Sequence, residues 1–175
     1  MNLQKFTVKA QEAVQKAMEL AASKTHQGIE PPHLLEAFLS APDSVAVSIL
    51  RRVGANVDRL RAQAEEALEA LPAVTGASAG DQYVGEDLKK VFDRARAEAD
   101  VMDDAYVSTE HLLIGLVEGQ NEVGQALRDQ GASKDYVMEA LDDVRGGQGA
   151  DDPHAESRYE ALDRFAQDLN AMARE

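Results

Sequence analysis

Tyr106-Val107-Ser108-Thr109-Glu110-His111-Leu112-Leu113-Ile114-Gly115-Leu116 repeats the plan of an earlier stretch of the chain. That earlier stretch is Gly28-Ile29-Glu30-Pro31-Pro32-His33-Leu34-Leu35-Glu36-Ala37-Phe38, in which a histidine again precedes a Leu-Leu pair. The two histidines lie 78 positions apart, while Leu50 and Leu127 lie 77 apart, as do Gly54 and Gly131. Self-similarity at a fixed spacing is the sequence signature of a duplicated unit. The sequence therefore predicts two repeats with a one-residue difference in a loop.

Each predicted repeat contains four short helices with one apolar face. Apolar residues recur at spacings of three and four, as in the series Ala10, Ala13, Val14, Ala17, Met18 and Ala21, which is typical of an amphipathic helix. N-cap residues, an early proline pair and closing glycines indicate where helices begin and end. We expect helices to begin near Thr7, Pro31, Ser44 and Asn56 or Val57 in the first repeat, and near Gly85, Ser108, Val123 and Ser133 in the second.

The predicted fold class is all-α, with two tandem, pseudo-twofold four-helix repeats in one domain. This domain spans residues 1–146, with repeat one at about 1–72, a connector at 73–82 and repeat two at about 83–146. Small, polar and glycine residues in the connector are typical of a flexible link. Helices this short are marginal in water by themselves. We therefore expect the two repeats to complete one core together.

The helical pattern stops at Gly146-Gly147-Gln148-Gly149, and we interpret residues 147–156 as a flexible linker. Beyond it, Tyr159, Leu162, Phe165, Leu169 and Met172 recur at spacings of three and four, which predicts an amphipathic helix over residues 157–174. We expect this helix to have nothing to pack on within the chain. The interpretation is that residues 157–175 are the lead-in helix of a truncated further module.

The composition disfavours several classes of function. Thirty-two acidic and eighteen basic residues give a net charge of −14, which repels phosphate backbones and anionic lipids. Cysteine is absent, so disulfides, thiolate catalysis and cysteine-based zinc sites are excluded. The amino-terminal residues lack the apolar core of a secretory signal, and no apolar run approaches the roughly 20 residues of a membrane span. The expected location is the cytoplasm, without a nucleic-acid or membrane partner.

No catalytic constellation is recognisable. The glycines at 146–149 have neither a preceding strand nor a following Lys-Ser or Lys-Thr, so they do not form a phosphate loop. His33 and His111 hold equivalent places, which favours buried helix-start residues over ligands or bases. Asp103, Asp104 and Glu110 could suggest a cation site, but they lack the spacing of a calcium loop. We therefore predict no catalytic residue, metal or cofactor in this chain; His26 and His154, in predicted loops, receive no role.

Several motifs taken together resemble the N-terminal domain of the Clp unfoldases of the AAA+ family, most closely that of the ClpB-type disaggregases. They are Met1-Asn2-Leu3-Gln4-Lys5-Phe6-Thr7, the two histidine stretches, Leu71-Pro72 before the connector, Arg145-Gly146-Gly147-Gln148, Tyr159-Glu160-Ala161-Leu162, Phe165, Asp168-Leu169 and Ala173-Arg174. The resemblance implies a mobile domain that engages unfolded or aggregated proteins. The parent would be a homohexameric ATPase that uses ATP and magnesium and cooperates with the DnaK chaperone system.

The resemblance also implies site residues. A threonine near the first helix and an acidic pair beside the loop of the second repeat are linked to client handling in the family, and they correspond to Thr7, Asp104 and Glu110, with Asp103 as the alternative to Asp104. From the chain itself we expect Leu3, Phe6 and Thr7 to approach Tyr106 and Val107. Together these would form an apolar groove that binds clients weakly.

Alternative functions remain open at this point. Clp proteins that read phosphorylated arginine have a glutamate before the histidine of both repeats, whereas here Pro32 precedes His33. This difference argues against the reading of phosphoarginine and against a protease-linked ClpC-type unfoldase. An adaptor-docking domain of a ClpA- or ClpC-type protease-linked unfoldase stays the alternative within the family. A static module that docks one specific partner is a further alternative, and an enzyme is the least supported one.

Overall fold

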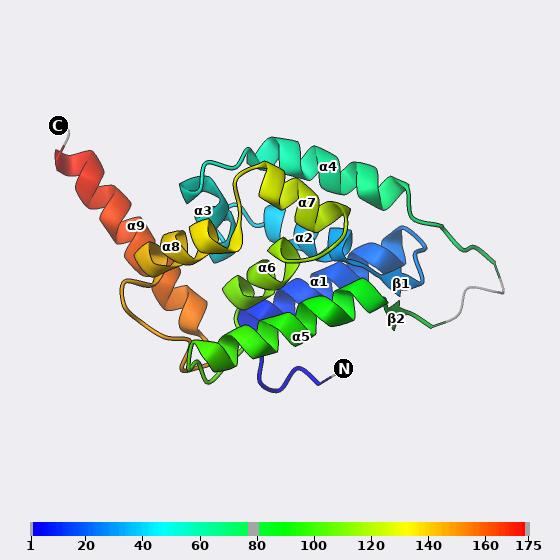
Figure 1. The fold of residues 1–175 in the computed structure, drawn as a ribbon, viewed down its shortest axis with the longest axis horizontal. Coiled ribbons are helices and arrows are strands. Elements are labelled where there is room, and N and C mark those ends of the chain that lie inside the picture. The colour runs from blue at the N-terminus through cyan, green and yellow to red at the C-terminus, as the bar shows by residue number, and fades with distance from the viewer. Residues whose placement is uncertain (1, 77–80, 174–175) are drawn as a thin grey trace.

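The computed structural model describes residues 2–76 and 81–173, and its regular elements are nearly all helices (Figure 1). In chain order the elements are α1 (Val8–Ser23), β1 (Gly28–Ile29), α2 (Pro31–Leu39), α3 (Val45–Arg52), α4 (Val57–Glu69), β2 (Tyr83–Val84), α5 (Glu86–Val101), α6 (Thr109–Val117), α7 (Glu122–Asp129), α8 (Lys134–Arg145) and α9 (Ala155–Ala173). The predicted all-α class and the four-plus-four helix order are confirmed. Part of the predicted connector, residues 77–80, lies outside the described residues.

Local capping explains where the helices begin. The side-chain oxygen of Thr7 accepts the Ala10 N–H, and Ser44 and Ser133 cap α3 and α8 in the same way. Each of these side chains satisfies one backbone donor that the first helical turn leaves unpaired. Gly54 and Gly131, which follow α3 and α7, have φ angles of +83° and +88°. Only glycine adopts that left-handed conformation without strain.

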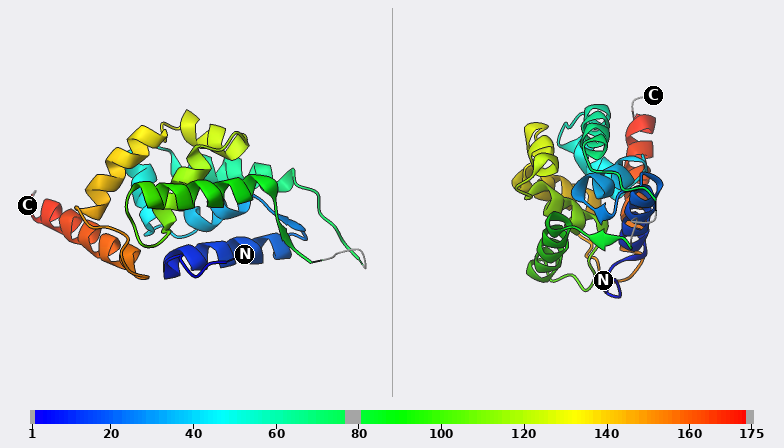
Figure 2. Two further views of the ribbon diagram at one scale, coloured as in Figure 1. Left: turned by 60° about the horizontal axis from the view of Figure 1, so that its bottom comes forward. Right: turned by 90° about the vertical axis from the view of Figure 1, so that its right-hand side faces the viewer.

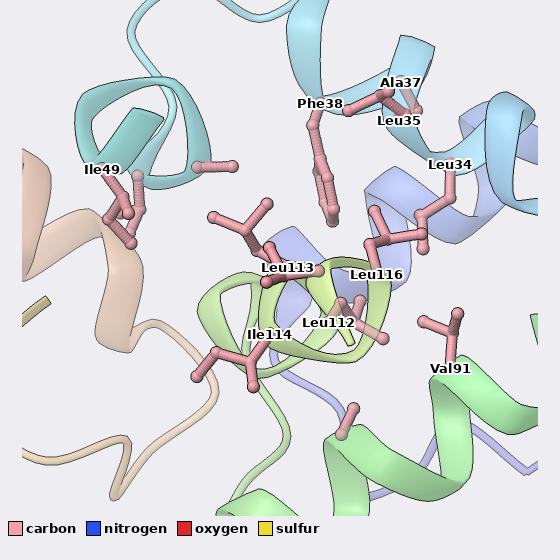
Figure 3. Close-up of a cluster of buried hydrophobic side chains, with 14 of the residues drawn as sticks. Leu34, Leu35, Ala37, Phe38, Ile49, Val91, Leu112, Leu113, Ile114 and Leu116 are labelled. Atoms are coloured by element: carbon pink, nitrogen blue, oxygen red, sulfur yellow. The ribbon is translucent and has the colours of Figure 1, made fainter. Parts of the chain in front are cut away.

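The equivalent helices α2 and α6 form the centre of the molecule. Every residue of α6 is buried, and in α2 every residue except Glu36 is buried. Figure 3 shows Leu116 of α6 and Leu34 of α2 pointing toward one another, with Phe38 directed at the same region. Gly115 of α6 lies so close to α5 that an added Cβ would stand 2.6 Å from the Val91 carbonyl oxygen. The central helices therefore make the core that the two repeats share.

Two short backbone pairings lock the repeats together, and periodicity did not reveal them. Residues Gly28 and Ile29 of repeat one pair in parallel with Tyr83 and Val84, which begin repeat two. The symmetrical pairing joins Phe6, before α1, to Val107, before α6. Phe6 lies 78 positions before Val84, and Val107 lies 78 positions after Ile29, so the two pairings are equivalent. Each repeat thus supplies a segment to the other.

The last helix departs from the sequence-based expectation that it has nothing to pack on. Its first turns pack against α8 and α3, and the Tyr159 side chain is fully buried. Asp163, one turn further on, accepts hydrogen bonds from Ser48 and Arg52 of α3. Beyond that point α9 projects from the body of the domain (Figure 2). The large apolar residues of α9 that are exposed are Leu162, Phe165, Leu169 and Met172. The predicted amphipathic helix is confirmed, whereas the prediction that it has nothing to pack on is wrong.

Candidate functional site

A groove of about 340 Å³ runs between α1, α2, the turn that follows α2, and the first half of α9. Its floor is apolar, because Ala37, Phe38 and Val45 form it and are themselves buried. Its borders carry charges of both signs, on Lys9, Glu12, Lys16, Asp43 and Glu160. A concave apolar floor with a charged rim can hold an apolar side chain and is undemanding about sequence.

The amino-terminal segment and the loop before α6 do approach each other. The Val107 N–H donates to the Lys5 carbonyl at 2.8 Å, and the Thr7 N–H donates to the Val107 carbonyl at 2.9 Å. Phe6 meets the ring of Phe92 edge-on, with centroids 6.0 Å apart. These contacts bury Phe6, Thr7 and Val107, while Leu3 and Tyr106 stay half-buried. Of these five residues, only Leu3 and Tyr106 could offer a client an apolar side chain.

Tyr106 and Val107 also border a hollow of about 530 Å³ on this side of the molecule. Its remaining lining is largely polar, with Asn2, Lys5, Arg96, Asp100 and Asp104. The hollow is therefore less suited to an apolar segment than the groove beside α1 and α2.

The two central histidines begin their helices in the predicted way. His33 Nδ1 accepts the Glu30 N–H at 2.9 Å, and His111 Nδ1 accepts the Ser108 N–H at 2.8 Å. Because Nδ1 is the acceptor, the neutral ring carries its proton on Nε2. That proton is directed at Asp104 Oδ2 in repeat two, 2.8 Å from His111 Nε2. The structural interpretation of both histidines is confirmed.

His26, for which no role is predicted from the sequence, is the partner of His33. Its Nδ1 lies 2.8 Å from His33 Nε2, and both rings are buried. Burial, and then the nearness of His26 and Lys24, which disfavours a further positive charge, lower the pKa of His33 to about 4. Burial also lowers the pKa of His26. Repeat one thus contains a neutral histidine pair where repeat two contains a histidine and a carboxylate.

Asp104 and Glu110 face inward onto Arg145, at the end of α8. Arg145 Nη2 lies 2.9 Å from Asp104 Oδ2 and 2.7 Å from Glu110 Oε1. Burial alone would raise the pKa of Asp104, but hydrogen bonds from His111, Arg145 and the Ala150 N–H outweigh it and lower the pKa to about 2. Asp103 is exposed and has a positive φ of 57°. The acid that belongs to the buried cluster is therefore Asp104.

Thr7 is tied to the segment that follows the double repeat. Its hydroxyl donates to Glu156 Oε2 at 2.5 Å, and the same oxygen accepts the Thr109 N–H at 3.1 Å. Glu156 and Tyr159 are fully buried, and the Arg145 guanidinium lies over the Tyr159 ring at 5.5 Å. Sequence reasoning missed Arg145, Glu156 and Tyr159. No local pattern signals them, because the need of Asp104 and Glu110 for a cation follows only from their burial in the folded chain.

The comparisons identify the fold. Residues 5–130 match the family described as the Clp repeat (R) N-terminal domain. The chain belongs to this family. It is 35% identical over 176 residues to the chaperone protein ClpB of Bacillus cereus and 38% identical over 169 residues to that of Mycobacterium tuberculosis strain H37Rv, which covers 99% and 97% of the chain. In both cases it spans 20% of the relative's length and corresponds to the N-terminal region.

Solved structures agree with the Clp N-domain fold. The Hsp104 N-terminal domain of Candida albicans superposes with a TM-score of 0.74 at 22% identity, covering 87% of this chain and 99% of that one. A complex of the ClpV N-domain with a VipB peptide gives a TM-score of 0.62 at 15% identity, covering 81% and 93%. Clp N-domains therefore keep this double repeat at low sequence identity.

Within 2–76 and 81–173, no group of three or more histidine, aspartate or glutamate side chains is arranged to hold a metal ion. In the same part of the chain, no helix has the length and apolar character needed to cross a membrane.

Proposed function

We propose that this Clp N-domain binds exposed apolar segments of unfolded or aggregated polypeptides and delivers them to a ClpB-type disaggregase motor. The observation that carries the proposal is the groove between α1 and α2, with its buried floor of Ala37, Phe38 and Val45. The solved complex of the ClpV N-domain, which has the same fold, with a VipB peptide supports peptide binding by such a domain.

The groove favours weak binding with little sequence preference. Covering two or three apolar side chains contributes roughly 1.5–3 kcal/mol each, and lost freedom of motion offsets much of that gain. Rapid exchange suits a domain that must release each client to a motor. Several copies on a homohexameric ring would restore affinity through effective concentration.

The proposal extends to the longer protein that the ClpB relatives represent. Such a parent would bind ATP and magnesium in other domains, act in the cytoplasm and cooperate with the DnaK system. Within the present chain no catalytic role is proposed.

The site residues expected from the sequence fit this proposal in two groups. Leu3 and Tyr106 are half-exposed and would add contacts beside the polar hollow. Phe6, Val107, Thr7, Asp104 and Glu110 would support that surface from below, since their side chains are buried.

Two exposed alanines allow a matched test of where a client binds. Ala41 borders the α1–α2 groove, and Ala105 borders the hollow near Tyr106. An unfolded apolar polypeptide is titrated into the domain while amide chemical shifts are recorded. We expect shifts along α1 and α2 that Ala41→Glu abolishes and Ala105→Glu retains. The opposite result would move the site to the hollow, and shifts confined to residues 147–173 would refute both.

The alternative within the family, docking of one adaptor, predicts a different titration. Binding would then be tight, would show slow exchange and would depend on the sequence of the peptide. A scrambled peptide of equal composition separates the two: a client-binding domain accepts both versions, and an adaptor-docking domain accepts only one.

A further inference from the structure

The carboxyl group of Glu156 joins three parts of the chain. Glu156 lies in the first turn of α9, is fully buried, and accepts hydrogen bonds from the Thr7 hydroxyl and the Thr109 N–H. Thr7 is the N-cap of α1, and Thr109 is the first residue of α6. One side chain of α9 thus occupies the N-terminal ends of two domain helices, where backbone N–H groups without intrahelical partners need an oxygen acceptor.

The segment before α9 is held by hydrogen bonds with Asp104, Tyr106 and Val8. Asp104 Oδ1 accepts the Ala150 N–H at 3.0 Å, and the Ala150 carbonyl accepts the Tyr106 N–H at 3.0 Å. The Pro153 carbonyl accepts the Val8 N–H at 2.8 Å. Through these contacts residues 150–159 form a strap across the ends of α1, α5 and α6. The side chains of Thr7, Asp104 and Glu110 all form hydrogen bonds with this strap or with Arg145.

The charges in this cluster do not balance. Asp104, Glu110 and Glu156 supply three carboxyl groups, and Arg145 supplies one permanent cation. His111 is neutral, because its Nδ1 accepts the Ser108 N–H and its Nε2 donates to Asp104. Glu110 Oε2 and Glu156 Oε1 are buried without a protein partner among the described residues, as is the Tyr159 hydroxyl. A proton on Glu156 would remove one of the excess negative charges.

We propose that Glu156 is the latch of a proton-dependent contact, which holds α9 and the strap on the domain when its carboxyl group is neutral and loosens them when it ionises. In this role Thr7, Asp104 and Glu110 position the strap. The inference concerns the link between the domain and α9 and is independent of client binding.

The direction of the pH dependence follows from the surroundings of Glu156. Burial, and then the charge of Glu110, outweigh the lowering effect of the hydrogen bonds from Thr7 and Thr109 and raise the pKa of Glu156 to about 7, from an ordinary value of 4.5. The groups that face it are Thr7 at the N-cap of α1, Thr109 and Glu110 from α6, and Tyr159 from α9 itself. Arg145 from α8 pairs with Glu110. The docked state retains a proton that the released state loses. Docking is therefore strongest near or below pH 4.5 and weakens as pH rises to about 7, by up to about tenfold per pH unit.

The absence of cysteine allows a direct test. Glu65→Cys on α4 and Asn170→Cys near the end of α9 place two spin labels at exposed positions, and their distance distribution is measured at about pH 5.5 and about pH 8. We expect a narrow distribution at the lower pH and a broad component that grows at the higher pH.

Three variants test whether Glu156 is the group whose ionisation loosens α9. Glu156→Gln, an uncharged isostere, should stay narrow at both pH values, and Glu156→Ala should be broad at both. Glu160 also lies on α9 and has a pKa raised by burial, so Glu160→Gln is the matched control and should behave as the parent does. A parent distribution that does not change with pH, an unaltered pH response in Glu156→Gln, or loss of that response in Glu160→Gln would overturn the proposal. Amide spectra recorded on each variant establish that the double repeat is folded.

Discussion

Asp104 is the structural equivalent of His26: each precedes a central histidine by seven residues and lies 2.8 Å from its Nε2. The residues before them match as well, since Thr25 and Asp103 both have a φ of 57°. The duplicated backbone is thus conserved between the repeats while the partner of the histidine differs. Repeat two has a charged cluster at this position, and repeat one has a neutral pair.

Removal of the Asp104 carboxylate should destabilise the domain strongly. Asp104→Ala leaves Arg145 with fewer acceptors and His111 with an unpaired donor, and breaking a buried pair from one side costs about 3–5 kcal/mol. Urea unfolding followed by circular dichroism measures the change. Asp103→Asn is the matched control, because Asp103 is exposed and asparagine tolerates positive φ. Equal effects of the two substitutions would contradict the structure.

His33 should make stability depend on pH in a defined window. Its folded pKa of about 4 lies below its ordinary value of 6.5, so the unfolded chain takes up a proton first as pH falls. The stabilisation is complete above about pH 6.5 and is lost as pH falls toward 4, by on the order of 3 kcal/mol.

The comparison of the parent with His33→Asn isolates this effect. The difference in unfolding free energy between them should grow from about pH 4 to pH 6.5 and then level off. His154→Asn, at an exposed position, serves as the control. A difference that stays constant over the window would show that His33 does not titrate there.

Gly115 should tolerate no side chain. The Cβ of Gly115→Ala would meet the Val91 carbonyl at 2.6 Å, which forces α5 and α6 apart and should cost about 1–3 kcal/mol. Thermal unfolding is the measurement, and Asp143→Ala at an exposed site of α8 is the comparison. A Gly115→Ala variant as stable as the parent would indicate that the two helices lie further apart.

The Tyr159 hydroxyl should be dispensable, although its ring is not. The ring is fully buried beneath Arg145, and the hydroxyl has no protein partner in the described part of the chain. Tyr159→Phe should leave docking of α9 within about 0.5 kcal/mol or improve it slightly, whereas Tyr159→Ala should cost about 3 kcal/mol. Amide hydrogen exchange over residues 155–163 reports the docking. A large loss in Tyr159→Phe would reveal a hydrogen bond that the structure does not contain.

The sequence predicts the helices well, because each signal is local. Thr7, Ser44 and Ser133 act as caps where expected, and Gly54 and Gly131 close helices through their positive φ. The equivalence of His33 and His111 also follows from the repeat. Membership of the Clp N-domain family confirms the fold inferred from these features.

The polar interior could not be predicted in the same way. A charged residue in a glycine-containing segment usually faces water, so nothing local distinguishes the buried Glu156 from exposed acids such as Asp151. His26 has no periodic pattern around it, and its role depends on a contact with His33 that only the folded chain creates. The two-residue strands are likewise too short to give an alternating pattern.

The exchanged backbone pairings set the smallest unit that can fold. Phe6 of repeat one needs Val107 of repeat two, and Ile29 needs Val84 in the opposite direction. Either repeat alone would leave both of its pairing segments without their partners, along with much of the core around α2 and α6. We therefore expect cooperative unfolding in a single transition, in which neither half survives as a stable intermediate.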